Sequence, residues 1–505
     1  MKYVFNEDYD LSIEDRIFQI NSIDKDSIDL ENFKIDYNLK IINDFKELIL
    51  ANKESRFLII GDYDCDGLCA TSIMKKLLDD LDINSNYYIP TRFKDGYGLN
   101  PRIIDNAYNN NFDCLLCVDN GVAATEQVAY AKNLGLKVFI IDHHQYQSEP
   151  QCDGFLHPNL FPKEYSEMCA GGLCALLSNS FRYDELTTLY GGLSTISDMV
   201  NIFGYNRYMA KQMLELVKKN VSKPISMLLG DNEVTYRNIS FNVIPKINAV
   251  SRLDNLMNVN YVVKFLLSDE KEALAYFDKI ETINKARKEY SQQMNILAKR
   301  LIDINKNIIV VKHEEFKEGL CGLVANKLLD EYKKPTLVLA KVGDVLKGSG
   351  RSVPGVNMYE YLKDAKDLFE EYGGHELAVG LTIKEENYDK LIDYIENHEL
   401  SYEEQYSDVI VLRPENCNME LLDRIDSLRP FGTNFKEPLF GLKKTNNVSK
   451  YIVANKYPKF DFNENLSAIS FKTNFVNKDF NYMIGRIDKD SYYPNKVSFL
   501  IEDLV

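Results

Sequence analysis

Four short apolar stretches of the sequence each end directly in aspartate, and this repeated pattern limits the folds that the chain can adopt. The stretches are "FLIIGDYDCDG" (57–67), "LLCVDNG" (115–121), "VFIIDHH" (138–144) and "STISDMV" (194–200). A single aspartate after a strand is commonly a turn former or the N-cap of a helix. Four such ends close together indicate a site, because parallel strands bring their carboxyl ends to one edge of a sheet.

The segment from about residue 55 to 200 alternates between strand and helix patterns. We expect strands over 57–61, 113–118 and 137–141, and a further strand end before Asp198. Amphipathic helical segments such as 68–81 and 125–136 separate them. This βαβ rhythm predicts an α/β domain with a mostly parallel sheet.

The first stretch places Asp62, Asp64 and Asp66 within five residues. Carboxylates this close repel one another, and a buried charge needs a partner. Carboxylate and imidazole groups together suit divalent cations such as Mn²⁺ or Mg²⁺, and one carboxylate can bridge two ions about 3.5–4 Å apart. We therefore predict a pair of divalent ions at this edge, with ligands drawn from Asp62, Asp64, Asp66, Asp119, Asp142, His143, His144 and Asp198.

The length, composition and net charge of the sequence limit the classes of protein to which it can belong. Its 505 residues are enough for roughly two to four domains, and a hydrophobic content of 45% provides for a large core. The net charge of −16 argues against a generic polyanion binder, although metal ions and a local basic groove can reverse the field at one site. Nine irregularly spaced cysteines and an N-terminus without signal architecture indicate a cytoplasmic protein, and we expect no membrane span.

The remaining segments differ from the βαβ part. The first 50 residues are expected to form acidic helical packing material, and residues 268–305 are expected to form one long helix. A second α/β region starts at "NIIVVK" (307–312) and ends near residue 400. Short aromatic and β-branched runs over the last hundred residues predict a small β-barrel.

With these motifs in place, the sequence resembles a known family. "GDYDCDG", "VDNG", "DHH" and "SDMV" occur in the order of the four motifs of the DHH phosphoesterase superfamily. From about residue 55 to the C-terminus, further segments resemble successive parts of the RecJ single-strand-specific exonucleases. These segments are "YYIPTRFKDGYGLNP" (87–101), "IPKINAVSRLDN" (244–255), "GLCGLVANKLLDEY" (319–332), "GSGRS" (348–352), "YGGHELAVG" (372–380) and "LRPFGTNFKEPLF" (428–440).

The resemblance implies an organisation and an activity. The expected parts are an N-terminal helical extension (1–50), a DHH catalytic domain (51–265), a connector helix (266–305), a DHH-associated substrate-binding domain (306–400) and an OB-fold domain (401–505). The implied enzyme degrades single-stranded DNA from the 5′ end to mononucleotides with two Mn²⁺ or Mg²⁺ ions, in DNA repair or recombination. It is expected to be a monomer without a membrane partner, served by a helicase or a single-strand-binding protein.

Carried onto this sequence, the resemblance also implies roles for single residues. One ion is expected on Asp66, Asp119, His143 and Asp198, and the other on Asp64 and Asp119, with Asp62 close by. Asp119 then bridges the ions, Asp142 orients a neighbouring histidine, and His144 contacts the scissile phosphate or a catalytic water. We take His144, Asp142 and Asp119 as the catalytic candidates.

The substrate is expected to be held by arginines and glycine-rich turns. Guanidinium groups match phosphate geometry, and "GSGRS" and "GGH" offer backbone N–H groups for an anion. The predicted substrate-binding residues are Arg92, Arg252, Ser349, Arg351, Ser352, Gly373, Gly374 and His375. In the barrel, stacking on single-stranded DNA is predicted for Tyr451, Tyr457, Phe460 and Phe471 beside Lys459 and Arg486, with barrel core as the alternative for each aromatic residue.

The sequence departs from the family at three places, none of which removes a predicted ligand. Ile60 stands where some relatives carry histidine, "SDMVNIFGYNR" replaces "ADVVPL", and Ser251 replaces a glycine beside Arg252. Two alternative functions are considered. A small phosphatase or nanoRNase of the same superfamily would lack the connector and the barrel, and a non-catalytic replication scaffold would have lost its metal ligands.

Overall fold

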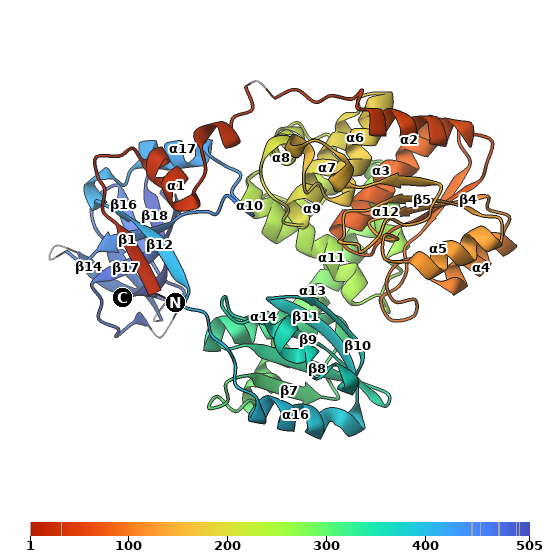
Figure 1. Ribbon diagram of the computed structural model, residues 1–505. Helices are drawn as coiled ribbons and strands as arrows, with labels where there is room; N and C mark the ends of the chain where they lie inside the picture. The colour runs from red at the N-terminus through yellow and green to blue at the C-terminus, as the bar shows by residue number, and fades with distance from the viewer. Residues whose placement is uncertain are drawn as a thin grey trace. The chain divides into compact units, whose positions relative to one another are not determined.

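The structure is a computed structural model that describes residues 2–31, 33–445, 448–454, 456–472, 475–490, 492–493 and 495–505. The chain forms two compact units (Figure 1). The first unit consists of Met1–Lys34, Met199–Tyr208 and Glu404–Val505, and the second of Ile35–Asp198 and Met209–Glu403.

A five-stranded parallel sheet lies at the centre of the first α/β part of the second unit. Its order is β3-β2-β4-β5-β6, and every neighbouring pair is parallel. The strands are β2 (Phe57–Ile60), β3 (Ser85–Tyr88), β4 (Cys114–Val118), β5 (Lys137–Ile141) and β6 (Gly154–Leu156). The three strands expected in this part of the chain are therefore confirmed.

Both faces of this sheet are covered by helices, which is why its strands are continuous apolar runs instead of alternating ones. Leu58 and Ile60 pack on one face in a cluster with α4 and α5. Phe139, on the other face, meets Phe45 of α2 with ring centroids 6.2 Å apart. The helices of this region are α2 (Lys40–Ala51), α3 (Cys65–Asp80), α4 (Pro101–Asn109), α5 (Thr125–Asn133), α6 (Ala170–Phe181) and α7 (Glu185–Ser197).

The prediction of a strand before Asp198 is wrong. This segment is the end of helix α7, and Asp198 is its C-cap. Leu189 and Leu193 lie one helical turn apart and are fully buried, as the core side of a helix requires. The short apolar stretch in "STISDMV" contains too few residues to distinguish the two periods.

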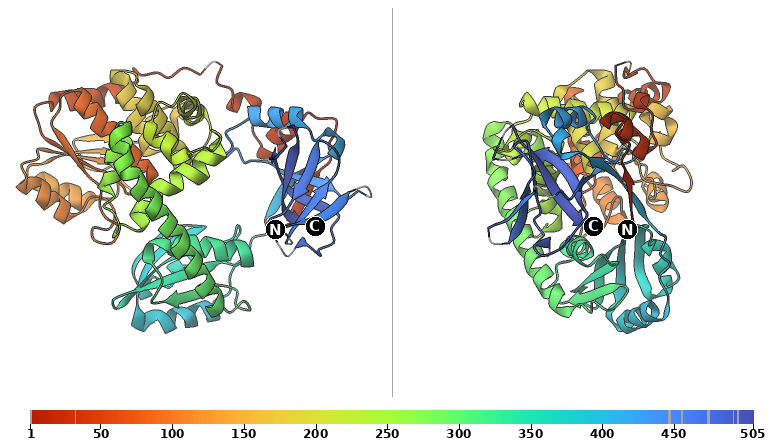
Figure 2. Two further views of the ribbon diagram at one scale, coloured as in Figure 1. Left: turned by 180° about the vertical axis from the view of Figure 1, so that it is seen from behind. Right: turned by 90° about the vertical axis from the view of Figure 1, so that its left-hand side faces the viewer.

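A long helix connects the helical layer of this region to a second sheet (Figure 2). Before it come α8 (Gly204–Lys218), which the boundary between the units divides, α9 (Lys223–Leu229), α10 (Tyr236–Asn238), α11 (Ile244–Arg252) and α12 (Asn260–Leu267). The long helix is α13 (Glu270–Leu301), and the side chain of Asp269 caps its N-terminus. In the described part of the chain, neither α13 nor any other helix has the length and apolar character needed to cross a membrane.

The second sheet of this unit is mixed and has the order β10-β11-β9-β8-β7. Only β7 and β8 run parallel, and the other neighbours are antiparallel. Its strands are β7 (Ile309–His313), β8 (Thr336–Val342), β9 (Val345–Arg351), β10 (Phe369–His375) and β11 (Ala378–Lys384). The accompanying helices are α14 (Cys321–Tyr332), α15 (Met358–Lys363) and α16 (Tyr388–Asn397).

The first unit is built on an eight-stranded sheet of order β1-β12-β13-β17-β18-β16-β15-β14. Its strands are β1 (Lys2–Asn6), β12 (Tyr406–Leu412), β13 (Leu439–Lys443), β14 (Ser449–Val453), β15 (Tyr457–Asp461), β16 (Leu466–Ile469), β17 (Tyr482–Lys489) and β18 (Val497–Leu504). Two helices, α1 (Ile13–Asn21) and α17 (Met419–Ser427), pack with it.

The N-terminal segment is not a single helical extension, so that expectation for residues 1–50 is wrong. β1 pairs in parallel with β12, and residues up to Lys34 belong to the first unit, whereas α2 belongs to the second. A five-residue edge strand whose partner lies about 400 residues away leaves no local pattern that could reveal the pairing.

Candidate metal centre

The carboxyl ends of the first parallel sheet bring the predicted acidic residues together. Three groups of side chains have ligand atoms within 4.8 Å of one another. They are Asp62, Asp64 and Asp119; Asp66, His143 and Asp198; and Asp119, His143 and His144. Asp119 belongs to two groups and His143 to two, so the three groups form one continuous cluster.

The turn after β2 is shaped by its own aspartates and by Gly67. Asp64 is the N-cap of α3, and its Oδ1 accepts the backbone N–H groups of Asp66 (2.9 Å) and Gly67 (3.1 Å). A Cβ at position 67 would lie 2.7 Å from the backbone nitrogen of Asp62. Only glycine therefore lets the turn close tightly enough to aim Asp62 and Asp64 at the same point.

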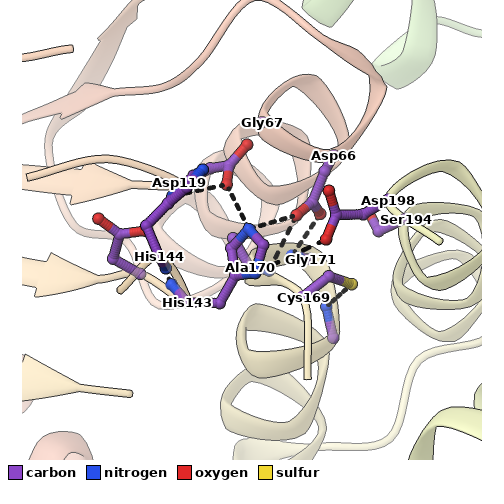
Figure 3. A network of polar contacts seen from close by, with 12 residues as sticks. Asp66, Gly67, Asp119, His143, His144, Cys169, Ala170, Gly171, Ser194 and Asp198 are labelled. Atoms are coloured by element: carbon purple, nitrogen blue, oxygen red, sulfur yellow. Dashed lines mark hydrogen bonds and ion pairs between the residues drawn. The ribbon is translucent and has the colours of Figure 1, made fainter. Parts of the chain in front are cut away.

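Asp66 is held by the N-terminus of α6 (Figure 3). Its Oδ2 accepts the N–H of Ala170 at 2.9 Å and its Oδ1 that of Gly171 at 2.7 Å. The free N–H groups and the dipole at a helix N-terminus stabilise a negative charge. These two bonds fix the position of the Asp66 side chain, which is almost completely buried.

Asp119 has a left-handed backbone conformation, with φ at 62°, which residues other than glycine rarely adopt. Its N–H donates to the carbonyl of Ile141 on the neighbouring strand at 2.9 Å. The Asn120 amide fixes the next position, since its Nδ2 donates to the carbonyls of Ile60 and Val118, both at 2.9 Å. These bonds turn the Asp119 carboxylate out of the strand and into the cluster.

His143 lies between three carboxylates. Its Nε2 is 3.2 Å from Oδ1 of Asp119 and 3.8 Å from Oδ2 of Asp66, and its Nδ1 is 3.6 Å from Oδ2 of Asp198. Asp198 comes from the end of α7 and Asp66 from the start of α3, so helices as well as strands supply this group (Figure 3). Burial lowers the pKa of His143, which favours the neutral imidazole that a metal ion requires.

Asp142 belongs to none of the three ligand groups, and its carboxylate contacts the neighbouring His144. Its Oδ1 lies 2.8 Å from Nδ1 of His144, and its Oδ2 accepts the N–H of Val122 at 3.0 Å. Burial alone would raise the pKa of Asp142, but the hydrogen bond and charge of His144 and the backbone N–H bonds lower it to about 2. Burial lowers the pKa of His144, and the Asp142 carboxylate more than offsets this and raises it to about 9.

The carboxyl groups of Asp62 and Asp119 lack enough nearby positive charge to balance their burial and the neighbouring aspartates. Burial, followed by repulsion from neighbouring aspartates, raises the pKa of both Asp62 and Asp119 well above the usual range. The Oδ1 atoms of both residues are buried and have no hydrogen-bond partner among the described residues. These buried carboxylate oxygens, the His143 imidazole and the position of Asp119 between Asp62, Asp64 and His143 fit a pair of divalent cations.

This electrostatic imbalance predicts how the metal-free protein responds to pH. Burial and the charges of Asp66 and Asp64 raise the pKa of Asp198 to about 8 from an ordinary 3.8. Between these values the folded state holds a proton that the unfolded state releases, so stability falls as pH rises through this window. Thermal unfolding in chelator should show a lower Tm at pH 8 than at pH 5, and a smaller decrease in Asp198→Asn. An identical decrease in both proteins would contradict this assignment.

Substituting Asp142 should lower activity without removing a metal ligand, because Asp142 contacts His144 and belongs to none of the three ligand groups. Asp142→Asn keeps the size of the side chain but removes the charge that holds His144 protonated. Loss of such an outer partner lowers activity roughly 10- to 100-fold. We expect kcat to fall within that range at neutral pH while the metal-binding isotherm stays close to that of the wild type. A fall as deep as that of a ligand variant would show that Asp142 binds metal directly.

The three predicted arginines gather beside the acidic cluster, and a fourth joins them. Burial and the charges of Arg92, Arg287 and Arg351 lower the pKa of Arg252 to about 10. Arg252 donates to the carbonyl of Gly319 at 3.2 Å, and Arg351 to that of Gly350 at 2.7 Å. Within the described residues, none of the four guanidinium groups has a carboxylate at ion-pair distance, so their positive charges are not neutralised by an ion pair.

Most of the other predicted substrate-binding residues lie on the second sheet. Gly373 of β10 pairs with Gly380 of β11, which pairs with Ser349 of β9, so the three share one face. Gly374 and His375 follow on the exposed edge strand β10. Ser352 differs from the others because it is buried and its hydroxyl donates to the carbonyl of Val356 at 2.7 Å, which fixes the loop after β9.

Sequence reasoning missed Arg287 and Tyr97. Arg287 lies in α13, whose sequence pattern indicated only a packed helix. The structure adds that its charge acts on Arg252. The Tyr97 hydroxyl donates to the carbonyl of Asp119 at 2.9 Å and lies 3.4 Å from Nδ1 of His144. Its place in the segment "YYIPTRFKDGYGLNP" was the one available signal, because that segment also carries Arg92.

Three family models match separate parts of the chain. The DHH family N-terminal domain matches residues 56–196, the DHHA1 domain residues 305–398, and the RecJ OB domain residues 410–502. The first covers every residue of the acidic cluster except Asp198, the second covers the mixed sheet, and the third covers most of the eight-stranded sheet.

The curated relatives that match this chain include several RecJ proteins. A single-stranded-DNA-specific exonuclease RecJ of Salmonella typhimurium is 30% identical over 436 residues, which cover 76% of this chain and 74% of the relative. The RecJ protein of Bacillus subtilis is also 30% identical, over 75% of this chain. The match spans only 51% of that longer relative.

Solved structures agree with the fold. RecJ from Thermus thermophilus in complex with Mn²⁺ superposes with a TM-score of 0.83 at 21% identity, over 97% of this chain and 75% of that one. A structure of exonuclease RecJ bound to manganese gives a TM-score of 0.63 at 25% identity, over 72% of this chain and 95% of that one.

Proposed function

This chain belongs to the family of RecJ single-stranded-DNA-specific exonucleases, and from that membership we propose that it hydrolyses single-stranded DNA to mononucleotides with two divalent metal ions. The single observation that carries the proposal is the acidic cluster, in which Asp119 groups with Asp62 and Asp64 and also lies 3.2 Å from His143, which groups with Asp66 and Asp198. We further propose that degradation starts at the 5′ end, as the family resemblance implies, and that it serves DNA repair or recombination. The 25% identical relative that was solved with manganese supports Mn²⁺ as one of the ions.

The side chains divide between two ion positions. Asp66, Asp119, His143 and Asp198 would hold one ion, and Asp62, Asp64 and Asp119 the other. When bound, such ions lower the pKa of a coordinated water and offset charge on a leaving oxygen. The protein contributes fixed positions for these ligands, because the N-terminus of α6 holds Asp66, and the Ile141 carbonyl of β5 holds the strained backbone of Asp119.

His144 is proposed to act on the phosphate itself. With its Nδ1 bonded to Asp142 and its pKa raised to about 9, the ring is protonated at neutral pH. A protonated imidazole can donate from its second nitrogen to a phosphate oxygen and so stabilise the charge that develops in the transition state. Tyr97 packs edge-on against the ring at 5.9 Å between centroids and limits its movement.

Arg92, Arg252 and Arg351 are proposed to clamp the phosphate backbone of the strand. Arg252 and Arg351 keep part of their donors occupied by backbone carbonyls, which sets their orientation. Arg92 stacks over the ring of Tyr63 with its Cζ 4.3 Å from the centroid, and its Nε is buried without a partner in the described chain. An arriving phosphate would satisfy these groups, because guanidinium and phosphate form paired hydrogen bonds.

Aromatic and basic residues of the eight-stranded sheet are proposed to bind single-stranded DNA. Tyr451 of β14 pairs with Lys459 of β15, and the Tyr457 and Phe471 rings meet edge-on at 5.5 Å. Phe471 is 66% exposed, which leaves a ring available for stacking on bases. Two candidates fail: Phe460 is buried in the core, and Arg486 is bound to Glu437 and Glu502.

We also propose the cellular setting that follows from the activity. An enzyme restricted to single strands needs a helicase or a single-strand-binding protein to provide them. All nine cysteines are free thiols, which agrees with a reducing cytoplasm. A monomer carries every predicted ligand within one unit of its own chain.

The test uses one long single-stranded DNA with distinguishable labels at its 5′ and 3′ ends, with and without Mn²⁺. Immediate release of the 5′ label as a mononucleotide, only with metal, is the expected result. Early release of the 3′ label would overturn the polarity. Stability of the long strand combined with cleavage of dinucleotides would favour a nanoRNase-like phosphatase instead.

A further inference from the structure

Two cations on neighbouring helices are held by neutral side chains. Arg287 of α13 donates from Nε and Nη2 to Oδ1 of Asn284, at 3.2 and 2.9 Å. Lys327 of α14 places its Nζ 3.0 Å from Oγ of Ser291. Asn284 and Ser291 are each 3% exposed and lie seven residues apart, so both belong to the buried face of α13.

The next cation along the same two helices, Lys299, has a charged partner instead of a neutral one. Lys299 of α13 forms an ion pair with Glu331 of α14, one turn beyond Lys327. A carboxylate neutralises the cation that it orients, whereas an amide or a hydroxyl orients it and leaves the charge in place. Glu331 therefore neutralises the charge of Lys299, whereas Arg287 and Lys327 have neutral partners and keep their positive charges.

Retaining these charges is unfavourable in the free protein. Burial and the charge of Arg287 lower the pKa of Lys327, and the same charge contributes to the lowered pKa of Arg252. Arg287 thus lies within electrostatic reach of both the phosphate clamp and Lys327. Among the described residues neither cation has a carboxylate partner, so their repulsion persists until an anion arrives.

We propose that Arg287 and Lys327 form a second phosphate site, which binds the phosphodiester adjacent to the one held by Arg92, Arg252 and Arg351. Asn284 and Ser291 are its positioning residues. The inference rests on the proposed function, because it takes the strand bound at the clamp as its ligand. It assigns the connector helix a direct role in holding DNA, beyond joining two domains.

Binding without cleavage tests the site. The probe is a labelled 5′-phosphorylated dodecathymidylate in chelator, titrated by anisotropy over a series of salt concentrations. Each lost phosphate contact should reduce the slope of log K against log salt by about 0.7 for a single strand. We expect this loss in Arg287→Gln and in the exposed Lys327→Gln, and no loss in Lys299→Gln, whose charge is already neutralised by Glu331.

A single-phosphate ligand separates the two sites. Thymidine 5′-phosphate should bind wild type, Arg287→Gln and Lys327→Gln alike, and should bind Arg252→Gln more weakly. Wild-type slopes in both Arg287→Gln and Lys327→Gln would overturn the second site. Because no metal is present, these slopes are measurable even if the protein fails to cleave DNA, so the two proposals fail separately.

Asn284→Asp distinguishes a binding role from a structural one. The new carboxylate keeps the shape of the side chain and pairs with Arg287. If Arg287 only stabilises the helix, Tm should rise and dodecathymidylate binding should stay unchanged, which would contradict the proposal. The proposal expects Tm to hold or rise while binding weakens, with the salt slope reduced as in Arg287→Gln.

Discussion

Asp119→Asn is expected to abolish hydrolysis of single-stranded DNA while the fold survives. Removing one preorganised group that stabilises transition-state charge costs about 10²–10³ in kcat. Asp119 belongs to the ligand group of Asp62 and Asp64 and lies 3.2 Å from His143 of the other ion position, so its loss should weaken both positions and exceed that range. The measurement is the rate of nucleotide release at saturating Mn²⁺, together with the Mn²⁺-binding isotherm.

Stability separates this effect from misfolding. In chelator the variant should unfold at the same or a higher temperature than the wild type, because the neutral amide would carry no charge where burial disfavours one. Exposed Asp79, which pairs with Lys75 on the surface of α3, provides the matched control as Asp79→Asn. Metal-dependent turnover near the wild-type rate in Asp119→Asn would contradict the bridging assignment.

Gly171→Ala is expected to damage the metal centre without touching a ligand. A Cβ at this position would lie 2.0 Å from Oγ of Ser194 and 2.9 Å from Oδ1 of Asp66. Helix α7, which ends in Asp198, or helix α6, which holds Asp66, must therefore move (Figure 3). Overpacking of this kind costs about 1–3 kcal/mol of stability.

Displaced ligands should raise the Mn²⁺ concentration needed for half-maximal activity about 10- to 100-fold, the range seen when partners that hold ligands are lost. Gly135→Ala is the control for general destabilisation. Its φ of 86° strains any side chain, yet a Cβ there meets nothing within 4 Å. Equal Mn²⁺ requirements in both variants would show that the α6–α7 contact does not position the ligands.

Most of the acidic cluster was predictable from the sequence because it depends on topology. Parallel strands that end in aspartate must converge, and Asp62, Asp119 and His143 follow directly from that rule. Asp198 was assigned to the cluster correctly but for the wrong structural reason. It arrives on a helix, whose approach depends on the glycine contact at Gly171, a tertiary feature that no local pattern contains.

The features that were missed depend on contacts distant in sequence. β1 pairs with β12 across nearly the whole chain. Arg287 is distinguished by its neutral partner and by neighbours on other elements, and both become visible only in three dimensions. Ser352 and Phe460 were chosen for their motif or residue type, whereas their burial is set by the packing of the loop and the sheet.

The most direct test of the central claim is to locate Mn²⁺ by anomalous diffraction from crystals of this chain. We expect two peaks about 3.5–4 Å apart, both within coordination distance of the Asp119 carboxylate. One peak is then bounded by Asp66, His143 and Asp198, and the other by Asp62 and Asp64. A single peak, or two peaks that do not share Asp119, would contradict the two-ion centre on which the proposed hydrolysis depends.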